Sequence, residues 1–261
     1  MSTFALISFC QLLSAFFSAV VAIKLFSSGL YRRYRIFFIY FIFRVPYQII
    51  TSFRFHQNPG SMTYLDFFLY TEPVVLLFYI LVVLELYGLV LERYKGLYTL
   101  GRWAMYAAIV ISVTISVLTL LPKIAPSTPE PSRNLFKEVA VERGVDFSLV
   151  IFILLIVAFL GRYPVPLSRN VIVHTGIYSV FFLTQTLVLL LRTLFGINDA
   201  TQFNLILTTI SLTCTIAWAV LLSAKGEEIQ VNAPQLRPDS EERILRQLDA
   251  LNQTLLKVSR E

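Results

Sequence analysis

Long runs of apolar residues separated by short polar segments dominate the chain. A helix needs about 20 mostly apolar residues to cross about 30 Å of hydrocarbon, and the sequence contains seven such runs. They predict helices at residues 4–26, 36–53, 64–91, 102–121, 146–163, 168–192 and 202–222. The pattern therefore predicts an all-α, polytopic membrane protein built as a seven-transmembrane-helix bundle.

The polar segments divide the rest of the chain. Residues 1–222 are expected to form the transmembrane domain, 223–237 a linker, and 238–261 a short cytoplasmic helix at the C-terminus. Residues 122–145 contain PSTPEPS, and their Pro and Ser content is typical of a loosely packed surface loop. This loop is the predicted external feature.

The C-terminal helix has Asp239 or Ser240 as a suitable N-cap. Its apolar residues are spaced four, three, four and three, as at the a and d positions of a coiled coil: Ile244, Leu248, Leu251, Leu255 and Val258. This spacing predicts a homo-oligomer or a membrane protein partner held through the helix. An amphipathic helix on the membrane surface, or docked on the bundle, fits the same pattern.

Composition supports the membrane interpretation and narrows the partners. Hydrophobic residues make up 56% of the chain and charged residues 15%, with a mean hydropathy of +0.70, outside the usual balance of soluble proteins. The basic residues behind the net charge of +6 lie beside apolar runs, so the expected partner is the lipid bilayer and not nucleic acid. Cys10 and Cys214 both fall inside apolar runs, and we expect no disulfide, metal or cofactor.

Basic residues predict the orientation, because positive charge is retained on the cytoplasmic side. Three alternate connections hold eight of the 22 Lys and Arg residues: Arg32, Arg33, Arg35, Arg93, Lys95, Arg102, Arg162 and Arg169. The other connections hold six: Arg54, Lys123, Arg133, Lys137, Arg143 and Arg192. The expected location is the cell (inner or plasma) membrane. The N-terminus is expected outside and the C-terminus in the cytoplasm.

Charged side chains at membrane depth are costly and mark candidate sites. Arg44, Glu85 and His174 lie eight, seven and six residues from predicted cytoplasmic ends, each about 9–12 Å deep at about 1.5 Å per residue. The hypothesis is one buried polar layer, either structural or part of an ion path. Its expected contact is Arg44 with Glu85, while His174 could instead bond a backbone carbonyl.

A second polar set is expected nearer the outside. Gln11, Glu72 and Gln185 each lie about 10 Å below the predicted outer boundary. They predict an outward-facing polar cavity, with hydrogen bonding between helices as the alternative.

The last predicted helix has hydroxyl residues on one stripe at Thr208, Ser211 and Thr215. Such a stripe indicates either a packing seam or a solute path. Trp103 and Trp218, near predicted cytoplasmic ends, are interpreted as interfacial anchors.

Two resemblances concern short motifs. Glu92-Arg93-Tyr94 resembles the acidic-Arg-Tyr motif of G-protein-coupled receptors, but residues 202–222 contain no Asn-Pro pair. The run YRRYRIFFIYF, the TEP and ELY triplets and the PLSRN segment are together similar to uncharacterised heptahelical bacterial membrane proteins. That resemblance covers most of the chain and implies fold and location, with no assigned activity.

The sequence offers little for catalysis. It has two histidines, His56 and His174, with no HExxH motif and no phosphate-binding glycine loop. We therefore expect a non-catalytic membrane protein of receptor-like or scaffold type, with the C-terminal helix used for oligomerisation or partner contact. The alternative is a small transporter or channel that uses buried Arg, Glu and His residues as a solute or proton path.

Overall fold

The protein is helical through nearly all of its described residues. The structure is a computed structural model and describes residues 3–57, 62–92, 94–124, 130–162, 167–195, 200–228 and 230–231, with 246–247, 249–250 and 252–254 of the C-terminal segment. Its long helices are α1 (Thr3–Ser27), α2 (Arg35–Gln57), α3 (Met62–Val90), α4 (Lys95–Ile124), α5 (Glu130–Arg162), α6 (Arg169–Phe195) and α7 (Ala200–Leu221). The short elements are η1 (Leu30–Arg32), β1 (Leu167–Ser168), α8 (Ala224–Glu228) and β2 (Gln230–Val231).

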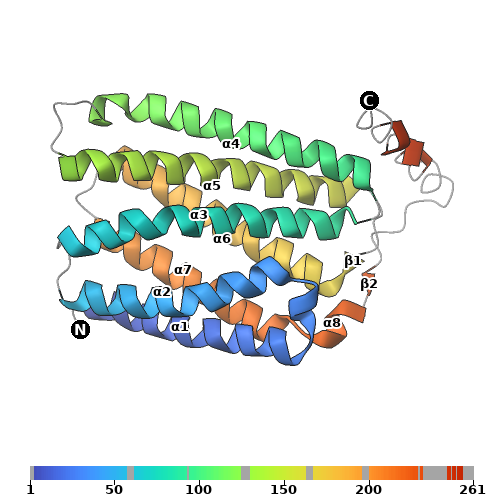
Figure 1. The fold of residues 1–261 in the computed structure, drawn as a ribbon, viewed down its shortest axis with the longest axis horizontal. Helices are drawn as coiled ribbons and strands as arrows, with labels where there is room; N and C mark the ends of the chain where they lie inside the picture. The colour runs from blue at the N-terminus through green and yellow to red at the C-terminus, as the bar shows by residue number, and fades with distance from the viewer. Residues whose placement is uncertain are drawn as a thin grey trace.

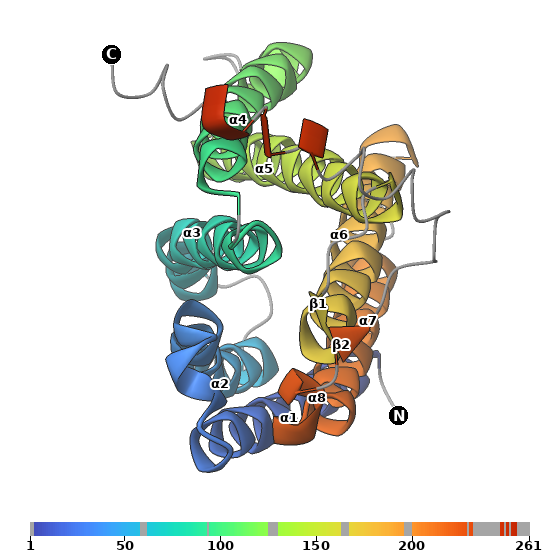
Figure 2. The ribbon, with the colours of Figure 1, turned by 90° about the vertical axis from the view of Figure 1, so that its right-hand side faces the viewer.

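The long helices lie side by side and alternate in direction, as Figure 1 shows. The second view (Figure 2) looks along them and shows α1, α2, α3, α5, α6 and α7 arranged as a ring, which closes where α7 packs against α1. The remaining long helix, α4, lies outside this ring against α5. The end of α1, the start of α2 and the short elements α8, β1 and β2 gather at one end of the bundle, which we name the charged end.

Aromatic side chains fill the centre of the ring. Tyr79 of α3 meets Phe181 and Phe182 of α6 edge-on, with ring centroids 5.5 and 5.4 Å apart. Phe37 of α2 meets Trp218 of α7 in the same manner at 5.3 Å. These contacts join α2, α3, α6 and α7 across the interior and account for much of the apolar core.

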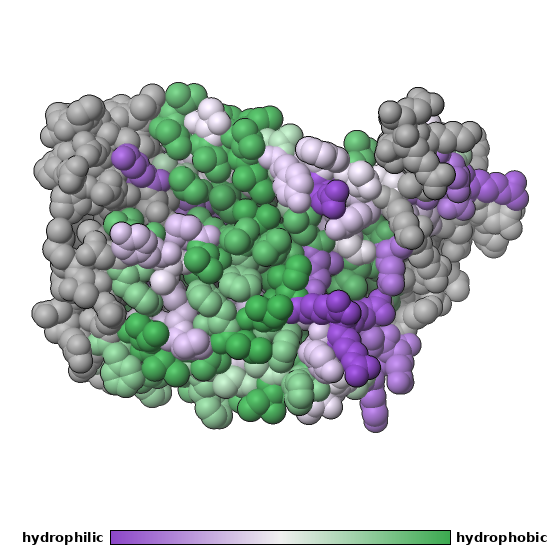
Figure 3. Space-filling model, viewed as in Figure 1, coloured by the Kyte–Doolittle hydropathy of each residue, from purple (hydrophilic) through white to green (hydrophobic). Residues whose placement is uncertain are grey.

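Six of the described helices are long and apolar enough to cross a membrane: Ala5–Ser27, Arg35–Phe53, Leu69–Val90, Gly96–Thr119, Arg169–Leu191 and Thr201–Leu221. Large apolar side chains also cover the outside of the bundle, where Phe16, Val110 and Val220 are 60%, 66% and 68% exposed. Figure 3 shows this green apolar surface, with purple hydrophilic residues gathered at the charged end. An apolar exterior of this extent suits lipid and not water. The chain is a multi-pass membrane protein.

The loop predicted at residues 122–145 is wrong over most of its length. α4 continues to Ile124 and α5 begins at Glu130, so the two helices form a long hairpin. Pro131 falls in the first turn of α5, where a missing N–H group breaks no helical bond. Arg143 then holds the two helices together, because its Nε donates to the Ser116 hydroxyl at 2.9 Å.

The described part of the segment predicted as a linker, residues 223–237, contains two short elements. Residues 224–228 form α8, and β2 pairs antiparallel with β1 through Leu167 with Val231 and Ser168 with Gln230. This pairing attaches the chain after α7 to the start of α6. Apart from α5, which begins much earlier than predicted, the predicted long helices differ from the observed ones by about two turns or less at their ends.

Candidate functional site

Glu85 caps the start of α2. Its Oε1 accepts the N–H group of Ile36 at 2.8 Å, and its Oε2 accepts that of Phe37 at 3.0 Å. The first N–H groups of a helix have no partner within the helix and carry its positive dipole end. α2 has no acidic residue in its own first turn. A carboxylate on α3 therefore does what an N-cap side chain does elsewhere.

Arg44 lies two turns further along α2 and is only 5% exposed. Its Nη2 donates to the Ser211 hydroxyl on α7. The guanidinium also lies over the rings of Tyr40 and Phe41, at 5.6 and 5.8 Å from their centroids, and such cation–π contacts stabilise a cation out of water. Ser211 belongs to the hydroxyl stripe of the last predicted helix, and at this position the stripe accepts a hydrogen bond from α2.

The predicted contact between Arg44 and Glu85 is wrong. The Glu85 carboxylate is bound at Phe37, and Arg44 is seven residues further on, about 10 Å along the helix axis. The prediction considered only side chains as partners of Glu85, whereas its carboxylate binds backbone N–H groups of α2. The three residues therefore do not form one layer.

His174, on α6, lies at the level of Glu85 and is surrounded by aromatic rings. Its ring centroid is 4.3 Å from that of Phe37 and 4.9 Å from that of Tyr34. The ring centroid of Trp218 is 6.3 Å from that of His174. Trp218 is only 2% exposed, so its predicted role as an interfacial anchor is wrong. Among the described residues, Nε2 of His174 has no hydrogen-bond partner.

The outer set lies on three helices, with Gln11 on α1, Glu72 on α3 and Gln185 on α6. Glu72 is buried, while Gln11 and Gln185 are half-buried. Near Gln11 the polar contacts run between α1 and α2, where Gln48 donates to the Ser14 hydroxyl at 3.0 Å and Ser52 to the Ser8 carbonyl at 3.2 Å. The outward-facing cavity stays a prediction.

Sequence reasoning missed Asp146, on α5. Its side chain is fully buried, and among the described residues neither of its carboxylate oxygens has a hydrogen-bond partner. Glu142, one turn earlier, is also buried. Their four-residue spacing was visible in the sequence, but the preceding segment was interpreted as a loop and Asp146 as its boundary.

A separate polar cluster joins α8 to the charged end. The carboxylate of Glu227 forms an ion pair with the Nε of Arg33 at 2.9 Å. Its Oε2 accepts hydrogen bonds from the hydroxyl of Tyr34 and the Nδ2 of Asn170, each at 2.9 Å. Arg33 also pairs with Glu92, two residues after the end of α3, at 3.2 Å. One carboxylate therefore links α8 to the connection before α2 and to the start of α6.

Two further features fix this cluster. Asn170 donates to the Ser223 carbonyl at 2.8 Å and accepts the Ser223 N–H group at 3.3 Å, which holds the end of α7 on α6. Burial raises the pKa of the Tyr34 phenol, and the Glu227 carboxylate beside it adds to the rise. The phenol is thereby kept in the neutral form that donates to Glu227.

The C-terminal segment contacts the same end. Asn252 is 8% exposed, and its Oδ1 accepts the N–H group of Gly96, in the first turn of α4, at 2.7 Å. This segment is therefore docked on the bundle at Asn252, one of the arrangements compatible with its sequence. The predicted association residues Ile244, Leu248, Leu251, Leu255 and Val258 lie outside the described residues.

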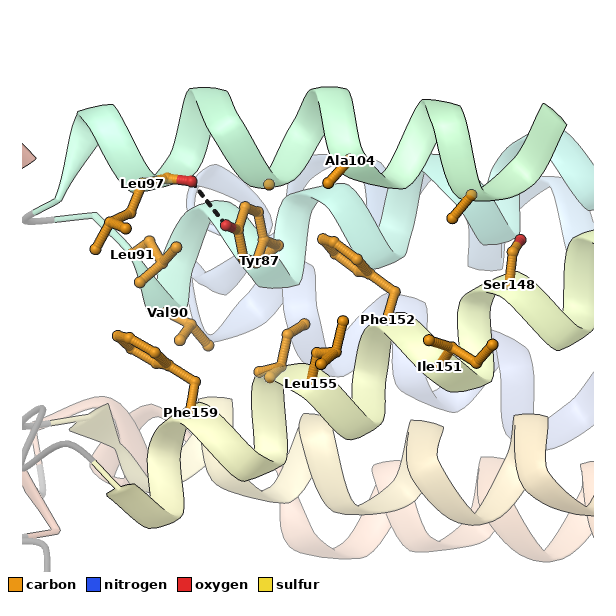
Figure 4. A pocket seen from close by; sticks show the side chains of 13 residues that line it. Tyr87, Val90, Leu91, Leu97, Ala104, Ser148, Ile151, Phe152, Leu155 and Phe159 are labelled. Carbon is orange, nitrogen blue, oxygen red and sulfur yellow. Dashed lines mark hydrogen bonds between the residues drawn. The ribbon is translucent and has the colours of Figure 1, made fainter. Parts of the chain in front are cut away.

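An open groove lies between α3, α4 and α5. Its volume is about 230 Å³. Figure 4 shows its walls, with Tyr87 from α3, Ala104 from α4, and Phe152, Leu155 and Phe159 from α5. Neither Arg44, Glu85 nor Asp146 lines it, so it is distinct from the polar interior.

The described residues include no group of three or more His, Cys, Asp or Glu side chains able to hold a metal ion. Compared with protein-family models, with curated proteins and with solved structures, the chain has no match in any of the three.

Proposed function

We propose that this chain is a non-catalytic, seven-span membrane protein of receptor-like or scaffold type, whose charged end binds a partner. α5 is the seventh span in this proposal. It packs along α4 and α6, and its 33 residues reach about 50 Å at about 1.5 Å per residue, more than the hydrocarbon thickness.

The observation that carries the proposal is the contrast between the interior and the charged end. Inside, Glu85 and Arg44 are used to bond helix to helix, and aromatic rings fill the space between them. At the charged end, Glu227 and Asn252 hold α8 and the C-terminal segment against the bundle. A fixed polar surface of this kind suits recognition of a partner better than passage of a solute.

The proposed orientation follows from charge. Arg32, Arg33, Arg35, Arg169 and Lys225 all belong to segments at the charged end. Positive charge favours the cytoplasmic side, so we assign this end, with the C-terminal segment, to the cytoplasm of a cell membrane. The N-terminus then lies outside, and the C-terminal helix is available for self-association or for a membrane protein partner.

Site-specific photocrosslinking in native membranes tests the proposal. A benzophenone amino acid is placed at Gln253, which is exposed at the charged end, and as a control at Phe16, which is exposed on the apolar face of α1. We expect a discrete protein adduct from Gln253 and none of the same size from Phe16. Equal adducts from both positions, or none from Gln253, would contradict a partner surface at this end.

Asp146 favours a second candidate function, a small transporter or channel. A fully buried carboxylate without a hydrogen-bond partner among the described residues is typical of proton or ion paths in membrane proteins. Proteoliposomes containing a pH-sensitive dye separate the two candidates. Proton flux above that of empty liposomes, and lost in Asp146→Asn, would favour transport, whereas the scaffold proposal expects no such flux.

A further inference from the structure

The groove between α3, α4 and α5 is lined almost entirely by apolar side chains. Two hydroxyls line it, and both are already used: Tyr87 donates to the Leu97 carbonyl at 2.8 Å, and Ser148 donates to the Val145 carbonyl at 2.7 Å. The other lining side chains are aliphatic or aromatic. The portion of a ligand that enters the groove is therefore apolar.

Its dimensions match an acyl chain from one leaflet. The lining runs from Leu97 to Ala108 on α4 and from Ser148 to Phe159 on α5, each about 16 Å at about 1.5 Å per residue. One leaflet contributes about half of the roughly 30 Å of hydrocarbon in a bilayer. A cavity of about 150 Å³ already binds benzene, so about 230 Å³ accommodates a longer segment of chain.

The groove also lies at the depth in the membrane where lipid acyl chains are found. Its walls on α3 and α4 belong to membrane-crossing segments, Leu69–Val90 and Gly96–Thr119. α4 packs closely along α5 but touches α3 little, which leaves the space open at its side. An empty apolar groove would lose dispersion contacts along both walls, and a lipid chain restores them.

Charge near the groove points to the headgroup. Arg102 follows Gly101, a lining residue, and its guanidinium lies 5.8 Å from the centroid of the Tyr98 ring. Among the described residues, its Nε has no hydrogen-bond partner. The N–H group of Gly96, at the start of α4, is already taken by Asn252. Of the described side chains beside the groove, Arg102 is therefore the cation that can meet an anionic group, and its long side chain can reach toward the interface.

We propose that this groove binds one anionic phospholipid from the leaflet at the charged end, with an acyl chain along α4 and α5 and the phosphate at Arg102. The site is separate from the partner surface at Gln253. Lipid binding in the groove does not require that the surface at Gln253 bind a protein.

Native mass spectrometry of the full-length protein tests the site. Delipidated protein is titrated with phosphatidylglycerol and with phosphatidylcholine of the same chains. Ala104→Phe fills the groove, and Ala108→Phe fills it deeper, where the alanine is less exposed. Ala107→Phe adds the same ring to α4 at an exposed position outside the groove and is the matched control.

We expect wild type and Ala107→Phe to retain one phosphatidylglycerol, and both groove variants to bind it about tenfold or more weakly, because several methylene contacts are lost. Arg102→Gln should bind both lipids with similar affinity. Equal lipid binding by the groove variants and the control would overturn the proposal. So would a dimer that both groove variants abolish and Ala107→Phe does not, since the occupant would then be a second copy of the chain.

Discussion

The carboxylate of Glu85 on α3 accepts the backbone N–H group of Phe37 in the first turn of α2, at 3.0 Å. Together with the bond to Ile36, this contact supplies acceptors to a helix start that is buried in the bundle. Removal of the Glu85 carboxylate leaves the N–H groups of Ile36 and Phe37 without this acceptor. We expect Glu85→Leu to lower the free energy of unfolding by about 1–3 kcal/mol.

Glu85→Gln is the matched variant, because it keeps one acceptor oxygen but loses the charge that favours the helix dipole. Its loss should be smaller than that of Glu85→Leu. Unfolding in mixed detergent and SDS, followed by circular dichroism, measures both. Equal stability of wild type and Glu85→Leu would remove the capping role.

Arg44 and Glu85 should behave as independent residues. Arg44 lies about 10 Å along α2 from Phe37, where the Glu85 carboxylate is bound, and its own partner is Ser211 on α7. Effects at this separation usually add within about 0.5 kcal/mol. The double variant Arg44→Met with Glu85→Leu should therefore show the sum of the two single losses. Recovery of stability in the double variant would instead indicate a direct ion pair, and the same unfolding assay distinguishes the two results.

Tyr34 should make the protein sensitive to alkaline pH. Burial, followed by Glu227, raises the pKa of this phenol in the folded state above the value of about 10 in an unfolded chain. A raised folded pKa contributes stability that is fully present below about pH 10 and is lost as the pH rises toward the folded pKa. Tyr34→Phe should lack this alkaline loss.

Thermal unfolding of both proteins between neutral pH and about pH 11 measures the difference. Tyr70→Phe, at a tyrosine that is 83% exposed, is the control and should keep the wild-type profile. An identical profile for Tyr34→Phe would exclude a contribution from this phenol.

Cysteine labelling decides the orientation. Cys10 and Cys214 are first replaced by alanine, and a single cysteine is then introduced by Lys137→Cys or Gln253→Cys, both at exposed positions. We expect labelling from outside at position 137, and labelling at position 253 only after permeabilisation. The reverse pattern would invert the topology, and labelling of both from one side would remove α5 as the seventh span.

The C-terminal segment should govern oligomeric state. A chain ending at Val231 keeps the Glu227 cluster and the pairing of β1 with β2, so its bundle should remain folded. Light scattering with size-exclusion chromatography should give a smaller assembly for this chain than for the full-length protein. The same mass per assembly for both would reject self-association through residues 244–258.

Hydrophobic patterning was sufficient to predict an all-helical membrane protein. Transfer of a long apolar segment into lipid is a property of the segment itself, so the segment at Leu69–Val90 can be recognised without knowing its neighbours. The extent of α5 could not be recognised in this way. Its first half is polar, and it is held to α4 by contacts such as Arg143 with Ser116, which depend on the hairpin having formed.

The sequence alone also identified Arg44, Glu85 and His174 as costly residues, since the penalty for a buried charge depends on residue type and depth. It could not identify their partners. Glu85 bonds to backbone groups that every residue carries, and Arg44 bonds to a serine 167 residues away. Only the tertiary structure decides which polar groups meet, because a hydrogen bond requires atoms within about 3 Å, and helix packing brings those atoms together.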